Sequence, residues 1–229
     1  GLENTKIGGL EISLSLSYYI GAVILLLGVL WTTFRIKEYP PKDFAEYNNI
    51  SETTQKESFW NILKTTPTVM YQLALVQFFT WMALFCVWTY GLNGIAENVF
   101  GVERILGEDG IMKINTENPA FNDARNWWGI ANAVMAIFAL AFSFVWPMLA
   151  NKFGRKIVYA SGLMIGAIGF ISIVFIRHTN PEEFNIAKYI LLLSMAAWGI
   201  ATAVINAIPF AIVCAKIPKQ KMGVYMGIF

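Results

Sequence analysis

Five long runs of the chain carry no charged residue, and they constrain the fold more than any other feature of the sequence. They cover residues 12–34, 65–96, 126–151, 157–176 and 189–215. A helix needs about 20 apolar residues to cross the hydrocarbon core of a bilayer, so each run is long enough to span a membrane. A backbone inside lipid must satisfy its own hydrogen bonds, which helices of this length do. We therefore expect an all-α, polytopic membrane protein built as a bundle of spanning helices.

The composition agrees with a membrane location. Charged residues make up 14% of the 229 residues, and the mean hydropathy is +0.53; average soluble chains carry about 25% charged residues. A net charge of +2 with no long basic run argues against a nucleic-acid partner. The cysteines, Cys86 and Cys214, lie inside apolar runs, and we expect buried thiols rather than a disulfide. His178 is the only histidine, so we expect no metal, no cofactor and no catalytic group.

The charges of the connecting segments predict the orientation of the spans. The link at residues 151–156 holds three cations and no anion, which places it on the cytoplasmic side. Alternation of the spans then puts residues 35–64 and 216–221 on the same side, with residues 97–125 and 177–188 outside. The three inner segments hold 11 of the 17 lysine and arginine residues, so the cation count agrees with this topology.

The connector at residues 35–64 allows two interpretations. Pro40-Pro41 interrupts any continuous helix there. Thr54 and Glu57 fit a capping box, and apolar residues follow at roughly helical spacing. A short amphipathic helix on the membrane surface and an ordinary solvated linker both fit this pattern.

Glycine and proline predict details of the other segments. Gly91 and Gly94 predict that the second spanning helix, expected to start near Pro67, ends near Tyr90. The following acidic segment is expected to be a loop. Pro209 falls inside the fifth run, and a sixth apolar run begins shortly before the end of the sequence.

The cytoplasmic link resembles a known family signature. Asn151-Lys152-Phe-Gly154-Arg155-Lys156 resembles the loop of the major facilitator superfamily, roughly Asp-Arg/Lys-x-Gly-Arg-Arg/Lys, which joins the second and third helices of each half. Gly154 permits a positive-φ turn, and the three cations would pair with carboxylates or helix C-termini that shift during transport. Asn151 departs from the acidic residue of the family. A generic basic hairpin under the positive-inside rule fits the link equally well.

Two longer stretches resemble sugar transporters of the sucrose/maltose type, the glycoside–pentoside–hexuronide-like family. Residues 73–85 resemble its seventh helix. Residues 208–211 together with 218–229 resemble its junction of helices ten and eleven. Some relatives carry an acidic residue where this chain has Ala215-Lys216, so the role of that carboxylate does not carry over. The resemblance covers nearly the whole chain.

The resemblance implies an internal fragment of a twelve-helix bundle, from helix six to the start of helix eleven. Residues 1–34 would be an outer loop and the last helix of the N-terminal half, and residues 35–64 the cytoplasmic connector between the halves. Residues 65–229 would hold four spans of the C-terminal half and the truncated start of a fifth. The missing N-terminal half of the same polypeptide would then be a structural partner.

Polar residues near the middle of the spans are the candidate substrate site. No span carries an interior charge, so a proton relay would lie outside this sequence. A sugar site needs amide or hydroxyl groups and aromatic faces near the midplane. Gln77 and Trp81 share one helix face there, Asn206 lies near the middle of the fifth span, and Asn132 lies in the outer half of the third. Interhelical hydrogen bonds, or plain packing for Trp81, would also explain these residues.

We therefore expect a secondary active transporter for a sugar, a glucose-containing disaccharide such as maltose or sucrose, that moves with protons by alternating access. Its partners would be the sugar, protons and the lipid bilayer, in a bacterial inner membrane or a plasma membrane. An uncoupled facilitator or an exporter on the same fold is the near alternative. A polytopic membrane enzyme or receptor is the distant alternative. An enzyme should place histidines, carboxylates or a nucleophile together inside the bundle, and the spans show no such catalytic group.

Overall fold

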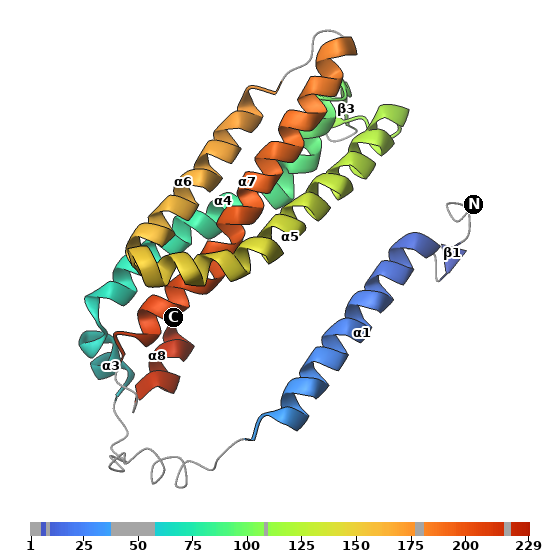
Figure 1. The fold of residues 1–229 in the computed structure, drawn as a ribbon. Coiled ribbons are helices and arrows are strands. Elements are labelled where there is room, and N and C mark those ends of the chain that lie inside the picture. Colours follow the sequence, from blue (N-terminus) through green and yellow to red (C-terminus); the bar gives the residue numbers. More distant parts are fainter. Residues whose placement is uncertain (1–5, 8–9, 38–57, 108–109, 177–180, 218–220) are drawn as a thin grey trace. The chain divides into compact units, whose positions relative to one another are not determined.

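The computed structural model describes residues 6–7, 10–37, 58–107, 110–176, 181–217 and 221–229. The chain divides into two compact units, Gly1–Glu57 and Ser58–Phe229. Five helices are long and apolar enough to cross a membrane, judged by length and composition (Figure 1). The expectation of an all-α polytopic membrane protein is confirmed, because these helices dominate both units.

The first unit contains one spanning helix. Strands β1 (Lys6–Ile7) and β2 (Leu10–Glu11) pair antiparallel, and α1 (Ile12–Arg35) follows directly. The helix agrees with the first uncharged run to within one residue. Near its end the Arg35 guanidinium lies 5.4 Å from the centre of the Trp31 ring, a cation–π contact. A tryptophan and an arginine at one helix end are typical anchors at a membrane interface.

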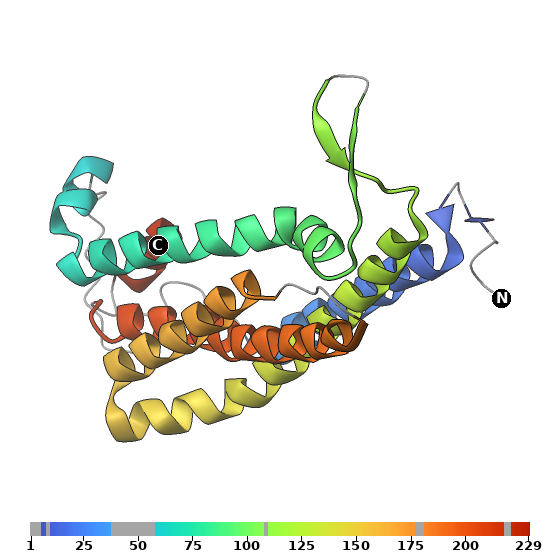
Figure 2. The ribbon, with the colours of Figure 1, turned by 90° about the horizontal axis from the view of Figure 1, so that it is seen from above.

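The second unit is a bundle of four long helices with shorter elements at both ends. Its elements, in order, are α3 (Phe59–Thr65), α4 (Thr68–Asn98), β3 (Arg104–Leu106), β4 (Met112–Ile114), α5 (Pro119–Phe153), α6 (Arg155–Val174), α7 (Pro181–Cys214) and α8 (Met222–Ile228). Figure 1 shows α3 and α8 at one end of the bundle and β3 at the other. Figure 2 shows the β3–β4 hairpin projecting away from the helices.

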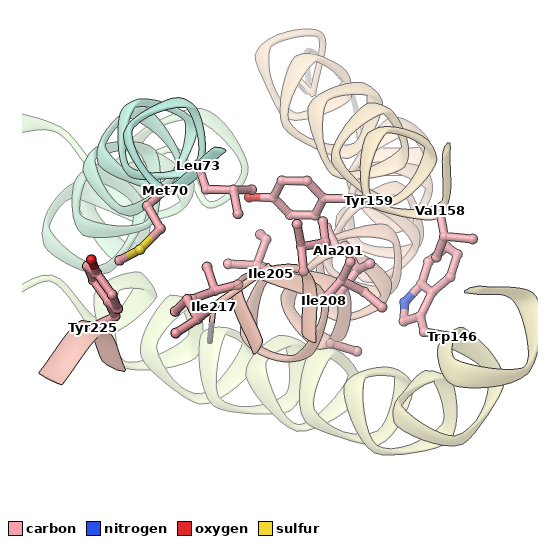
Figure 3. Packing of buried hydrophobic residues seen from close by; sticks show 14 residues of the cluster. Met70, Leu73, Trp146, Val158, Tyr159, Ala201, Ile205, Ile208, Ile217 and Tyr225 are labelled. Atoms are coloured by element: carbon pink, nitrogen blue, oxygen red, sulfur yellow. The ribbon is translucent and has the colours of Figure 1, made fainter. Parts of the chain in front are cut away.

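Helix α7 forms the centre of the second unit and packs along both α5 and α6. Small residues permit this approach: a Cβ added at Gly166 of α6 would lie 2.6 Å from the Cβ of Ala201. The largest buried cluster joins Ile208 of α7 to Leu73 of α4 and Trp146 of α5 (Figure 3). The core therefore lies where α7 meets the other long helices.

Helix α4 continues beyond its predicted end. We expected it to stop near Tyr90, but it runs through both glycines to Asn98. A Cβ added at Gly91 would lie 2.6 Å from Cη2 of Trp128, so the ring of this α5 tryptophan lies against the α4 backbone. Packing of this kind outweighs the roughly 1 kcal/mol that glycine costs a helix. The glycine allows close helix approach here and does not end the helix.

Helices α5 and α7 begin before their apolar runs do. Helix α5 begins at Pro119, where proline suits the first helical position, and Oδ1 of Asn118 accepts a hydrogen bond from the backbone N–H of Ala120 at 2.9 Å. Helix α7 begins at Pro181. The first two turns of each helix contain charged residues, so a search for uncharged runs placed both starts too late.

The segment expected to be an acidic loop contains a short antiparallel hairpin. Strands β3 and β4 pair with Ile105 opposite Lys113. At its base, Nη2 of Arg104 lies 2.6 Å from Oε2 of Glu97, and this exposed pair raises the pKa of Arg104. Strands of three residues are too short to show an alternating pattern, which is why the hairpin was not predicted.

The end of the connector folds as a short helix, α3, which is one of the two alternatives considered. Thr54 and Glu57 lie outside the described residues, and α3 follows Ser58. The Tyr225 hydroxyl of α8 donates to the backbone carbonyl of Thr65 at 3.3 Å, which fastens α3 to α8. Contact of α3 with the membrane surface stays a prediction.

Both cysteines have free thiols, but their burial differs from the expectation. Cys86 is exposed and Cys214 is half-buried. The burial predicted for Cys86 is therefore wrong.

Candidate substrate-binding site

A cavity between α4 and α7 brings together three of the four residues predicted to contact a sugar. Its volume is about 220 Å³. The lining residues are Ala74, Gln77, Phe78, Trp81, Asn206, Phe210 and Phe229. Gln77 and Trp81 lie one turn apart on α4, Asn206 lies on α7, and Phe229 follows α8. All seven of these residues are uncharged, so the cavity suits a neutral ligand.

Gln77 is half-buried and is held from two sides. The Tyr159 hydroxyl of α6 donates to its Oε1 at 3.1 Å, and its Nε2 donates to the carbonyl oxygen of Ile205 in α7 at 3.4 Å. Figure 3 shows Tyr159 reaching from α6 toward Leu73 of α4, with Ile205 nearby on α7. A carboxamide has two N–H donors and two acceptor lone pairs. One N–H and one lone pair of Gln77 therefore remain for a ligand.

Aromatic rings form much of the cavity wall. Trp81 is 45% exposed, and its ring meets the edge of Trp88 with 6.3 Å between centroids. The rings of Phe210 and Phe229 make an edge-to-face contact at 5.6 Å. Aromatic faces pack against the apolar face of a sugar ring, and carboxamides bond its hydroxyls. The wall therefore has the chemistry that a sugar site requires.

The two asparagines differ in position. Asn206 is exposed, and its Nδ2 donates to the carbonyl of Thr202 on its own helix at 3.0 Å, which leaves Oδ1 as an acceptor. Asn132 does not line this cavity. It is half-buried on α5, and its Nδ2 donates to the carbonyl of Trp128 at 2.8 Å. Substrate contact by Asn132 stays a prediction that the cavity does not support.

The link between α5 and α6 turns at Gly154, whose φ of 88° is the positive value expected for the motif. Arg155 begins α6, and its Nη1 donates to the carbonyl oxygen of Ala211 in the last turn of α7 at 2.6 Å. A cation at a helix C-terminus meets the partial negative charge of the helix dipole. The remaining motif residues have exposed side chains: Asn151, Lys152 and Lys156. A role of the link in conformational change stays a prediction.

Sequence reasoning missed Tyr159, which is 6% exposed and bonded to Gln77. A tyrosine in an apolar run gives no sign of its partner. Pro209 offered a better signal: proline has no N–H, so the carbonyl of Ile205 four residues earlier lacks its usual helical donor and is open to a donor such as Gln77 from another helix.

The described residues contain no group of three or more histidine, cysteine, aspartate or glutamate side chains placed to hold a metal ion.

The family model described as Major Facilitator Superfamily matches residues 7–229, which includes described parts of both units. Comparisons with curated proteins and with solved structures found no match.

Proposed function

The chain belongs to the major facilitator superfamily, and on that premise we propose that it carries a sugar. Proteins of this superfamily are membrane transporters, so the chain is part of an integral, multi-pass membrane transporter. The proposed substrate is a glucose-containing disaccharide such as maltose or sucrose, moved with protons by alternating access. The proposed location is a bacterial inner membrane or a plasma membrane.

The observation that carries this proposal is the cavity between α4 and α7. It combines the carboxamides of Gln77 and Asn206 with the ring of Trp81, and all of its lining residues are uncharged. A charged substrate would require an opposite charge in the low dielectric of the spans. A neutral, hydroxyl-rich ring requires hydrogen-bond partners and aromatic faces instead, which this cavity supplies.

The placement of these residues in the transporter is also a proposal. We assign residues 1–34 to an outer loop and the last helix of the N-terminal half, and residues 35–64 to the connector between the halves. Residues 65–229 belong to the C-terminal half. The support is the order of spans, connector and basic link, together with the resemblance to sucrose/maltose transporters. The N-terminal half would supply the opposite wall of the substrate site and the proton-coupling groups.

Proton coupling separates the proposal from its alternatives. In the full-length protein reconstituted in vesicles, an inward proton gradient should drive maltose or sucrose above its equilibrium concentration, and a protonophore should abolish the excess. An uncoupled facilitator would only equilibrate the sugar. An exporter would lower the internal concentration below the external one.

Substitutions in the cavity test the site itself. Losing a hydrogen-bond partner in a buried site costs about 1–3 kcal/mol, which corresponds to roughly ten- to a hundredfold in affinity. Gln77→Ala should therefore weaken sugar binding by this factor. Trp81→Ala should weaken it at least as much, because a stacking face is lost as well. Equilibrium binding of maltose and sucrose to the purified full-length protein measures both effects.

Phe85→Ala is the matched control, because Phe85 is an exposed aromatic residue on the same helix that does not line the cavity. It should bind sugar like the wild type. If well-folded Gln77→Ala and Trp81→Ala proteins also bind like the wild type, the cavity is not the sugar site.

A further inference from the structure

Pro209 removes the usual helical donor of one backbone carbonyl in the middle of α7. Proline lacks an N–H, so the carbonyl oxygen of Ile205, four residues earlier, loses its usual hydrogen bond from the α-helix ladder. Ile205 is 4% exposed, and an unsatisfied buried carbonyl is unfavourable. Nε2 of Gln77 in α4 lies 3.4 Å from this oxygen. Helix α4 thus supplies the donor that α7 lost to its proline.

This contact fixes the orientation of the Gln77 carboxamide. A backbone carbonyl only accepts hydrogen bonds, so the NH₂ group of Gln77 has to face Ile205 and its oxygen has to face the other way. That oxygen accepts from the Tyr159 hydroxyl at 3.1 Å. We call the Tyr159 hydroxyl, the Gln77 carboxamide and the Ile205 carbonyl the three-helix junction, because they join α6, α4 and α7.

The junction determines what Gln77 presents to the cavity. With its orientation fixed, the carboxamide offers one N–H and one carbonyl lone pair at defined positions beside Trp81 and Asn206. Tyr159 itself does not line this cavity, so its influence on a ligand there passes through Gln77. Without the tyrosine hydroxyl, the carboxamide would keep only its long contact to Ile205 and would be freer to rotate.

We propose that Tyr159 is a positioning residue for the substrate: it holds the Gln77 carboxamide in one orientation, anchored at the Ile205 carbonyl, whose usual helical donor Pro209 removes. The inference rests on the proposed function, since it takes the cavity as the sugar site. A sugar bound to Gln77 is thereby coupled to α7 at its proline, because the same carboxamide contacts both.

Tyr159→Phe tests the proposal, because it removes the hydroxyl and keeps the ring. One neutral hydrogen bond contributes about 0.5–1.5 kcal/mol, so sugar affinity should fall by roughly two- to tenfold. Discrimination between the sugar and its deoxy analogues should fall as well, since a rotating carboxamide selects hydroxyls less strictly. Tyr225→Phe is the matched control: Tyr225 is equally buried, but its hydroxyl bonds Thr65 and it does not line the cavity.

A double-mutant cycle separates positioning from a general effect on packing. If Tyr159 acts through Gln77, Tyr159→Phe should weaken sugar binding in the wild type and have no further effect in a Gln77→Leu protein. The same cycle in thermal unfolding, without sugar, should show that the two residues are coupled. Pro209→Ala gives a second variant: the new N–H at residue 209 competes with Gln77 for the Ile205 carbonyl and weakens this anchor, so discrimination among deoxy analogues should fall.

The outcomes separate this inference from the proposed function. Suppose that the wild type binds sugar but Tyr159→Phe and Pro209→Ala leave affinity and discrimination unchanged: the positioning role is then wrong, and the sugar site stands. The same conclusion follows if the effects of the Tyr159 and Gln77 substitutions on affinity simply add. If the full-length wild type binds neither maltose nor sucrose, the proposed function is wrong and the positioning role falls with it.

Discussion

Single glycines in the bundle have different roles, which the space around each of them decides. A Cβ added at Gly199 of α7 would overlap the backbone carbonyl of Met135 in α5. A Cβ added at Gly94 of α4 would meet nothing within 4 Å. A backbone carbonyl inside a helix cannot move aside as a flexible side chain can, so the two positions should respond differently to alanine.

Gly199→Ala should destabilise the bundle by about 1–3 kcal/mol, the usual effect of overpacking. Gly94→Ala is the matched substitution and should be neutral or stabilising by up to about 1 kcal/mol, because alanine favours the helix. Thermal unfolding of the two purified proteins in detergent measures the difference. Equal unfolding temperatures would mean that α5 and α7 do not approach each other this closely.

The sequence allowed the polar residues of the cavity to be predicted, but not their partners. Gln77, Trp81 and Asn206 were found from their chemistry and their depth in the spans, and the structure places them around one cavity. Depth alone does not give the direction of a side chain around its helix. For that reason Asn132 was included although it does not line the cavity, and Tyr159 was omitted although it bonds Gln77.

At the scale of elements, the link between α5 and α6 connects three helix ends. Gly154 ends α5 with a φ of 88°, which is unfavourable for β-branched residues, and a Cβ there would meet nothing within 4 Å. Arg155 contacts the last turn of α7 through Ala211. The link is therefore placed to affect how α5, α6 and α7 move together, while none of its own residues lines the cavity.

Gly154→Val, or neutralising Arg155 and Lys156 together, should slow transport and leave sugar affinity nearly unchanged. The reason is that these changes strain or release the link without altering the cavity. Uptake kinetics and equilibrium binding on the full-length protein measure the two quantities separately. Lys216→Gln is the control, because it also removes an exposed cation. A large loss of affinity with normal turnover would contradict this role.

The elements were predicted well where a single local signal determines them. Helix α1 and the start of α6 agree with their apolar runs to within two residues. The prediction failed where packing decided: α4 passes through Gly91 because Trp128 packs there. It also failed where a helix starts in polar sequence, as α5 does at Pro119. A search for apolar runs finds the part of a helix that spans the membrane and misses the polar turns that precede it.

At the scale of the whole molecule, the remaining question is which ends of the bundle face the cytoplasm. The short basic segments 152–156 and 216–221 hold three cations each, and short loops weigh most under the positive-inside rule. Within the second unit, the link between α5 and α6 and the β3–β4 hairpin lie at opposite ends of the bundle (Figure 1). The two ends should therefore lie on opposite sides of the membrane, with the hairpin outside.

Single cysteines introduced into a full-length protein that lacks Cys86 and Cys214 test this orientation. Leu106→Cys on the hairpin is the outer position, since Leu106 is 69% exposed. Asn151→Cys is the inner position, because that side chain is also exposed and its removal leaves the cation count unchanged. An impermeant thiol reagent should label Leu106→Cys in intact cells and Asn151→Cys only after permeabilisation. One span, α5, separates the two positions, so they must lie on opposite sides of the membrane. Labelling of Asn151→Cys in intact cells would show that the topology is the reverse of the predicted one and that the link is not cytoplasmic.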